Sequence, residues 1–212
     1  MYKLHYFPGN ASFTPHVLLR ELNLPFELEY VDRDNNAQKN ADYLKLNPAG
    51  RIPTLVKDDL VLFETAAICL HLVDTHTEAG LAPAFGTTER AHFYKWLIFM
   101  TNTIQPDILI YYYNARYTDD PKGGPALKQA TEKRLVGWFE IIEDALGDGP
   151  WFMGKDYSLL DIYLLMVARW GRYLSTPPRN MPKINAIARR ALERPAVKAA
   201  IAEEAIEGDF LT

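Results

Sequence analysis

The sequence predicts an α/β domain with a mixed sheet, in the order β-α-β-α-β-β-α, followed by an all-helical domain. Before about residue 80, short strand segments alternate with helical ones, whereas every periodic segment after Leu81 has helical spacing. Residues 77–88 are rich in glycine, proline and small side chains, which is typical of a domain boundary. We therefore expect one domain at residues 1–80 and a second at residues 88–212.

Hydrophobic periodicity places the elements of the first domain. Two alternating segments are joined by a stretch in which Val17, Leu18 and Leu22 recur at helical spacing. This pattern predicts a βαβ unit with parallel strands. Asp58 and Asp59 separate the last two strand segments and predict a tight hairpin. In order, we expect strand 2–7, a helix around 17–22, strand 26–31, helix 41–46, strands 54–57 and 60–63, and helix 65–75.

The second domain is expected to consist of helices alone. Pro106 interrupts the first long helical segment and predicts a kink there. Pro182 and Pro195 each begin a helical segment, where the missing N–H costs nothing because that group has no partner within the helix. The expected helices cover residues 88–113, 126–146, 158–173, 182–192 and 195–205.

The composition excludes several classes of protein. The chain has 212 residues, of which 48% are hydrophobic and 24% charged, and its formal net charge is −4. These fractions are ordinary for a globular protein, and the acidic balance argues against nucleic acid or an anionic membrane as a partner. No apolar run approaches the ~18–20 residues that a membrane helix needs, and the first ten residues do not resemble a signal peptide. We therefore expect a cytoplasmic protein.

The cysteine and histidine content argues against metal and disulfide sites. The single cysteine, Cys69, excludes an intramolecular disulfide and a cysteine zinc cluster, and its apolar surroundings predict a small buried core residue. Among five histidines, only His71 and His76 show even a weak ligand spacing. We expect no metal, and we expect the histidines at surface or capping positions.

Two short segments have the chemistry of a binding site, although spacing alone leaves each open to a simpler interpretation. If the Ile52–Pro53 bond were cis, the backbone of Ile52 would face outward and pair with an extended peptide; the alternative is an ordinary proline at a strand start. Thr65 is a plausible N-cap, where helix N–H groups attract a carboxylate, and the neighbouring Glu64 suits an ammonium group. The alternative there is a plain cap beside a solvated glutamate.

Several motifs, in this order, resemble those of one family. The segment Arg-Ile-Pro-Thr-Leu at 51–55, followed by Leu-Phe-Glu-Thr-Ala-Ala-Ile at 62–68, resembles the glutathione-binding region of cytosolic glutathione transferases. Residues 151–162 contain the spacing Ser-x-x-Asp, a helix capping box, and resemble the corresponding motif in that family's helical domain. The segment Ser-Phe-Thr-Pro-His at 12–16 is similar to the start of the first helix in the bacterial beta class.

The resemblance implies how glutathione is held. It implies a thioredoxin-like N-terminal domain that binds glutathione as co-substrate, with Pro53 in the cis form and the backbone of Ile52 paired with the cysteinyl part. Glu64 and Thr65 are then expected to hold the γ-glutamyl end, and Arg51 to contact a carboxylate.

The resemblance also implies a reaction and partners. The expected activity is that of a glutathione S-transferase, which activates the thiol of glutathione for attack on a small hydrophobic electrophile bound by the helical domain. Alternatives are a glutathione-dependent disulfide or peroxide reductase and a non-enzymatic binding module. The family is usually dimeric, so we expect a homodimer that uses the long helices near residues 90–101.

The group that activates the thiol is expected in the loop before the first helix. The beta-class pattern puts Ala11 where that class has a reactive cysteine, so a mixed disulfide through this residue is excluded. We rank Ser12 first, Asn10 second and Tyr6 third as hydrogen-bond donors to the sulfur. Ser12 is alternatively a pure helix cap, and Tyr6, which matches the tyrosine of tyrosine-type classes in position, is alternatively a core-facing strand residue.

The substrate pocket is expected to use side chains of the helical domain. The candidates are Gln105, Tyr112, Tyr113 and Arg169. Gln105 aligns with a position where the beta class often carries a histidine, so a histidine-assisted step is not expected. Because successive residues of a helix point in different directions, only one or two aromatic residues of 111–117 can line a pocket.

Overall fold

The structure is a computed structural model that describes all 212 residues. The chain divides into two compact units, of which the first comprises Met1–Ala82 with Leu192–Glu207 and the second Pro83–Ala191 with Gly208–Thr212. No helix is both long enough and apolar enough to cross a membrane.

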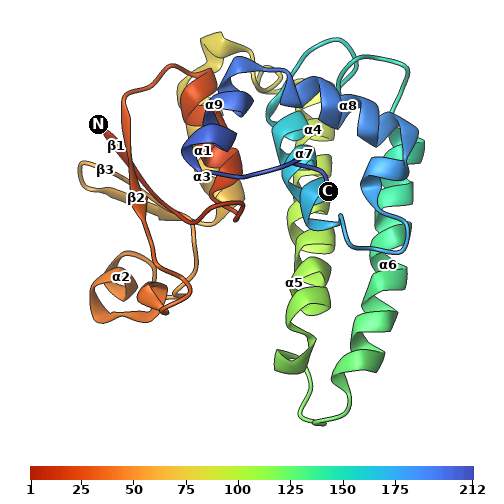
Figure 1. Cartoon of the computed structure of the whole chain (residues 1–212). Helices are drawn as coiled ribbons and strands as arrows, with labels where there is room; N and C mark the ends of the chain where they lie inside the picture. Colours follow the sequence, from red (N-terminus) through yellow and green to blue (C-terminus); the bar gives the residue numbers. More distant parts are fainter. The chain divides into compact units, whose positions relative to one another are not determined.

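The first unit contains a four-stranded mixed sheet, as the sequence predicts (Figure 1). The strand order is β2-β1-β3-β4; β1 is parallel to β2 and antiparallel to β3, and β3 is antiparallel to β4. The strands are β1 (Tyr2–Tyr6), β2 (Phe26–Tyr30), β3 (Thr54–Lys57) and β4 (Leu60–Phe63). The helices are α1 (Phe13–Glu21), α2 (Ala41–Leu46), α3 (Thr65–Thr75) and α9 (Pro195–Glu203).

Alternation along β1 separates the two faces of this sheet. Leu4 is fully buried and pairs in register with Leu55 of β3, and α1 and α3 contribute the fully buried Leu18 and Leu72 to the core. The neighbouring His5 points to the opposite face, where its ring meets that of Tyr43 on α2 with centroids 5.6 Å apart. Helices thus cover both faces of the sheet.

Helix α9 belongs to the first unit although it lies near the end of the chain. It packs against α1: Arg194 just before its start makes two hydrogen bonds of 2.5 and 2.7 Å to Glu21, and Glu203 at its end binds Arg20. The predicted helical domain, 88–212, included this helix. Its placement depends on ion pairs between residues more than 170 positions apart, which periodicity does not show.

The second unit is all-helical, as predicted, and differs in one detail. Its helices are α4 (Thr88–Phe99), α5 (Gln105–Tyr113), α6 (Gly124–Ala145), α7 (Leu159–Trp170) and α8 (Pro182–Leu192). The single helix expected over 88–113 is divided by a π-helical segment, Met100–Ile104, just before Pro106. Proline lacks an N–H and crowds the carbonyl four residues earlier, and the wider π turn relieves that conflict.

Helix α7 is the centre of the second unit. Residues 159–168 are all buried, so the helix is surrounded on every side. The predicted capping box is confirmed at its start, where Ser158 accepts the N–H of Leu160 and the carboxylate of Asp161 accepts the N–H of Ser158.

Candidate functional site

The strand register brings the predicted binding residues of the first unit to one end of its sheet. His5 pairs with Thr54, and Thr54 pairs with Phe63. Pro53 and Glu64, the next residues outward, therefore flank this end together with the loop that follows β1. A hydrogen bond of 3.2 Å from the hydroxyl of Thr65 to the carbonyl of Ala11 joins that loop to the start of α3.

The Ile52–Pro53 peptide bond is cis, as the resemblance implied. Ile52 and Pro53 are buried, and neither the N–H nor the C=O of Ile52 has a hydrogen-bond partner in the chain. The preceding carbonyl, that of Arg51, accepts hydrogen bonds from the Tyr43 hydroxyl and the Asn47 side-chain amide, both at 2.8 Å. The segment is therefore held rigidly on one side and presents an unpaired backbone on the other, while the Arg51 side chain is exposed.

Glu64 has an unusual backbone conformation at the start of α3. Its φ is 71° and its ψ is 113°, in the left-handed half of conformational space that residues with a Cβ rarely adopt. Such outliers cluster at functional sites. The side chain is exposed and makes no cap to α3, so the helix N-terminus and a carboxylate beside it both face outward.

Thr65 does not cap α3, which corrects the prediction from spacing. The N-cap position is Glu64, and Thr65 is the first helical residue. Its hydroxyl instead donates to Ala11, so a residue expected to end one element joins two of them.

The hydroxyl of Ser12 is used within the loop. Ser12 is fully buried; its Oγ donates to the carbonyl of Phe7 at 3.2 Å and accepts the Phe7 N–H at 3.3 Å. It stands at the N-cap position of α1 but makes no side-chain cap bond, so the simple-cap interpretation is wrong. Its proton is already committed to a backbone oxygen.

Asn10 is more open than Ser12. Its side chain is half-buried, and its Oδ1 accepts the N–H of Ala11 at 2.7 Å. The amide nitrogen has no hydrogen-bond partner in the chain. This leaves a polar donor available at the tip of the loop.

Tyr6 lies between α1 and the neighbouring strand β2. Its ring contacts those of His16 and Tyr30, with centroids 6.5 and 6.0 Å apart. Burial, with a further contribution from the Glu204 carboxylate, raises the pKa of Tyr6 above its usual value. The phenol therefore keeps its proton at neutral pH.

Cys69 is fully buried in α3, which confirms its interpretation as a core residue. Burial raises the pKa of its thiol well above the ordinary range. The chain therefore offers no thiolate of its own near this site.

The four predicted pocket residues in the second unit divide into two groups. Gln105 and Tyr112, two turns apart on α5, face α7: Oε1 of Gln105 accepts the Tyr163 hydroxyl and the Tyr112 hydroxyl donates to the carbonyl of Trp170, both at 2.7 Å. Tyr113 instead lies under the guanidinium of Arg116.

Arg169, on α7, is turned toward the chain terminus. Its Nη1 donates to the carbonyl of Phe210 at 2.6 Å, and its guanidinium lies 4.5 Å from the centre of the Phe210 ring. The structure therefore places Gln105 and Tyr112 against α7, Arg169 against the C-terminal segment and Tyr113 beside Arg116.

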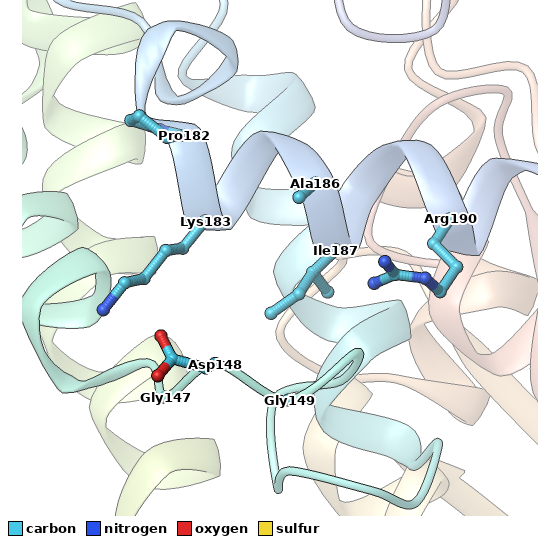
Figure 2. Close-up of a pocket in the computed structure, with 8 residues that line it drawn as sticks. All are labelled: Gly147, Asp148, Gly149, Pro182, Lys183, Ala186, Ile187 and Arg190. Carbon is cyan, nitrogen blue, oxygen red and sulfur yellow. The ribbon is translucent and has the colours of Figure 1, made fainter.

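A cavity of about 280 Å³ in the second unit lies elsewhere (Figure 2). It lies between α8 and the loop 147–149 and contains none of the predicted residues. Its two cationic side chains, Lys183 and Arg190, each donate to a backbone carbonyl, that of Leu146 and of Pro150 respectively. Both cations of this cavity are therefore engaged in holding the loop 147–150 against α8.

Comparison with known proteins identifies the family. Models of the N-terminal and the C-terminal domain of glutathione S-transferases match residues 1–74 and 106–204. The chain is 38% identical to a glutathione transferase of known structure from Methylococcus capsulatus, over 98% of this chain and 100% of that one, with a TM-score of 0.85. The chain belongs to the glutathione S-transferase family. The predicted fold, a thioredoxin-like domain followed by a helical domain, is confirmed.

Two further bacterial proteins are similar to this glutathione S-transferase family member over nearly its whole length. Glutathione S-transferase GST-4.5 of Xanthomonas campestris is 28% identical over 204 residues, which cover 96% of this chain and 99% of that protein. The solved structure of a sphingomonad glutathione S-transferase complexed with glutathione is 28% identical, covers 97% of this chain and 100% of that one, and has a TM-score of 0.82. The predicted resemblance to the bacterial branch is confirmed.

Sequence reasoning missed two residues that the structure places beside the loop. His16, expected at the surface or as a cap, is fully buried, and Glu204, at the end of α9, is 1% exposed. The contact between the His16 ring and the Glu204 carboxylate spans 188 residues, and that between Glu204 and the N–H of Gly9 spans 195. The only local signal was polar residues at otherwise apolar helix positions, which is too weak to pair them.

Proposed function

We propose that this protein is a glutathione S-transferase that joins glutathione to a small hydrophobic electrophile. The observation that carries the proposal is the meeting, at one end of the sheet, of the cis Ile52–Pro53 bond, the outward-facing start of α3 at Glu64 and the polar loop at Asn10. Family membership and the glutathione complex of a relative support it.

Each part of glutathione has a proposed partner. The N–H and C=O of Ile52 pair with the backbone of the cysteinyl residue, in the manner of an added strand. The N–H groups at the start of α3, with Thr65, receive the γ-glutamyl carboxylate, and Glu64 receives its ammonium group. Arg51, exposed next to Ile52, contacts a carboxylate of the tripeptide.

The proposed chemistry is a nucleophilic displacement or addition by the sulfur of glutathione. The thiol gives its proton to solvent, the thiolate electron pair forms the new S–C bond, and in a displacement the leaving group departs with the electron pair of the broken bond. A free thiol has a pKa of about 8.5, so only about 3% is ionised at pH 7. Lowering this pKa by about two units requires roughly 2.7 kcal/mol, which hydrogen-bond donors at a helix start can supply.

We now place Asn10 ahead of Ser12 and Tyr6 as the donor to the sulfur. The amide nitrogen of Asn10 is free, whereas the Ser12 proton is held by the Phe7 carbonyl. The role proposed for Ser12 is to shape the loop. Tyr6 stays a candidate, in third place, because its phenol keeps its proton and can donate it in a hydrogen bond.

The electrophile is proposed to contact side chains of the helical unit. Tyr112 and Tyr113 are the best placed, because both keep part of their rings accessible to solvent. Gln105 and Arg169 are proposed to set the shape of this surface through their bonds to Tyr163 and Phe210.

The proposed assembly is a homodimer in the cytoplasm. On α4, Tyr94 and Ile98 are exposed one turn apart and form an apolar stripe suited to a second copy. An Ile98→Glu variant should run as a monomer in light scattering while the wild type runs as a dimer. The cytoplasm is favoured because it supplies reduced glutathione.

A conjugation assay with an aryl halide, together with calorimetric titration of glutathione, tests the proposal. Asn10→Ala should lose most of the turnover and keep glutathione binding, Tyr6→Phe should change turnover little, and Ser12→Ala should lose stability as well as turnover. No glutathione binding by the wild type would refute the proposed function and favour a non-enzymatic module. Binding with poor conjugation but rapid reduction of disulfides would favour a glutathione-dependent reductase.

A further inference from the structure

The end of α9 reaches back to the loop that carries the proposed sulfur donor. Glu204 directly follows the helix and is 1% exposed. Its Oε2 accepts the backbone N–H of Gly9 at 2.8 Å, across 195 residues of sequence. A fully buried carboxylate therefore holds the residue immediately before Asn10.

His16 on α1 holds that carboxylate in turn. The ring is fully buried; its Nδ1 lies 2.9 Å from Oε1 of Glu204, and its Nε2 lies 2.7 Å from Oε2 of Glu203. Both ring nitrogens therefore face carboxylate oxygens, which fixes the imidazole between two acidic side chains.

The surroundings of His16 support this arrangement. Glu203 also binds Arg20 on α1, and the rings of Tyr6 and Phe26 cover the imidazole. His16 and Arg20 thus provide polar partners for the two carboxylates, so Glu204 is held without using any group in the glutathione site. Its second oxygen remains available for the loop.

The loop between β1 and α1 turns sharply at Gly9, and contacts from other segments fix its conformation. Gly9 has a φ of 64°, and within the turn the N–H of Asn10 and the hydroxyl of Ser12 both bond to the carbonyl of Phe7. Thr65 holds the far side of the loop through Ala11. Glu204 thus supplies the contact on the side next to Asn10, where a displacement of about 1 Å can cost about 100-fold in rate.

We propose that Glu204, oriented by His16, is a positioning residue that sets the loop at Gly9 so that Asn10 meets the sulfur of glutathione. This inference rests on the proposed function and assigns the end of α9 a part in it. The tripeptide itself is held by other residues, so Glu204 should govern the ionisation of bound glutathione rather than its affinity.

The test compares Glu204→Met with Glu204→Gln. Methionine fills similar space but removes the acceptor for Gly9. Glutamine keeps every contact. Its oxygen accepts the N–H of Gly9, its amide donates to one ring nitrogen of His16, and the other ring nitrogen donates to Glu203. The readouts are the ultraviolet absorbance of bound thiolate against pH, kcat and KM for conjugation, the calorimetric Kd for glutathione, and hydrogen exchange of the Gly9 amide.

For Glu204→Met, we expect the thiolate midpoint to rise by about one pH unit. Because kcat follows the ionised fraction of bound glutathione, it should fall about threefold at pH 7 and nearly tenfold at about pH 5.5, well below both midpoints. KM and Kd for glutathione should change by less than about threefold, a split that a general loss of structure does not produce. The Gly9 amide should exchange faster. Glu204→Gln should keep the wild-type midpoint.

Glu21→Gln is the matched structural control. It weakens the other bridge between α1 and α9, that to Arg194, without touching the loop, and should leave the midpoint unchanged. If Glu204→Met does not fold, Glu204→Asp, which withdraws the carboxylate by one methylene, should show the same rise in smaller measure.

A wild-type midpoint and kcat in the folded Met or Asp variant would overturn the proposal, and so would a raised midpoint in the Gln variant or in the Glu21 control. Failure of the proposed function would look different, because the wild type would then bind no glutathione. In that case Gly9 exchange still shows whether Glu204 holds the loop.

Discussion

The capping box of α7 gives a prediction in which burial and hydrogen bonding oppose each other. Asp161 is fully buried; its Oδ1 accepts the N–H of Phe152 at 2.7 Å, and its Oδ2 accepts the N–H and the hydroxyl of Ser158 at 2.8 and 3.2 Å. These bonds favour the carboxylate, but burial outweighs them and raises the pKa of Asp161 to about 6.

The sign of the pH dependence follows from this shift. The pKa of Asp161 is higher in the folded chain than its unperturbed value of 3.8, so between the two values the folded state binds more protons than the unfolded state. The stability that protonation contributes is present in full below about pH 4 and is lost as the pH rises through 6. Between pH 5 and pH 8 the loss amounts to about 1.4 kcal/mol.

An Asp161→Asn variant isolates this contribution. Asparagine does not titrate, and its amide must face either the Phe152 N–H or the Ser158 N–H, which leaves one buried donor unpaired at a cost of roughly 1–3 kcal/mol. We expect the wild type to exceed the variant in unfolding free energy at pH 5, and the difference to shrink by about 1.4 kcal/mol by pH 8.

Urea unfolding followed by tryptophan fluorescence measures the difference. Thr87→Ala, which removes the cap from Arg90 N–H in the same unit, is the control, because its loss of about 1 kcal/mol should not depend on pH. A difference between wild type and Asp161→Asn that stays constant or widens as the pH rises would contradict the expected loss of stability. It would mean that the three hydrogen bonds outweigh burial.

Three further predictions follow from single side chains. Glu64→Gly should raise the unfolding free energy by about 1 kcal/mol, because glycine adopts a positive φ without strain, and should weaken glutathione binding about tenfold in calorimetry through loss of a charged contact; a less stable variant would show that the backbone there is not strained. Asp107→Ala should lower the urea midpoint, by roughly 2 kcal/mol in free energy, because Asp107 accepts two bonds from Arg134 and one from Trp138; an unchanged midpoint would contradict this. Cys69 should react with an aromatic disulfide reagent only as fast as the protein unfolds, because burial raises the pKa of its thiol; prompt labelling of the native protein would show that it is accessible.

Much of the fold could be predicted from the sequence because its signals are local. The strands agree with the predicted ranges to within one residue, since alternation and the turn residues at 58–59 are read within a few positions. The capping box at Ser158 was also predictable, because its partners are three residues apart. The π-helical segment before Pro106 was not, since several backbone conformations relieve the same proline conflict.

The candidate site was predictable in part, because some of its signals are also local in the sequence. The motif around Pro53 and the Glu64–Thr65 pair could be located, but the use of each polar group could not. Both Ser12 and Thr65 had the pattern of helix caps, and both hydroxyls instead bond to backbone carbonyls outside their own helices. Which acceptor a hydroxyl meets depends on how neighbouring segments pack.

Local signals in the sequence predicted the order of the elements and the place of the motifs that resemble a glutathione-binding region, because periodicity, caps and turns act over a few residues. Only the tertiary structure decided that α9 joins the first unit and that Glu204 and His16 meet at Gly9. Such contacts join residues far apart in the chain, and a buried carboxylate is stable only where folding supplies its cation and its donors together.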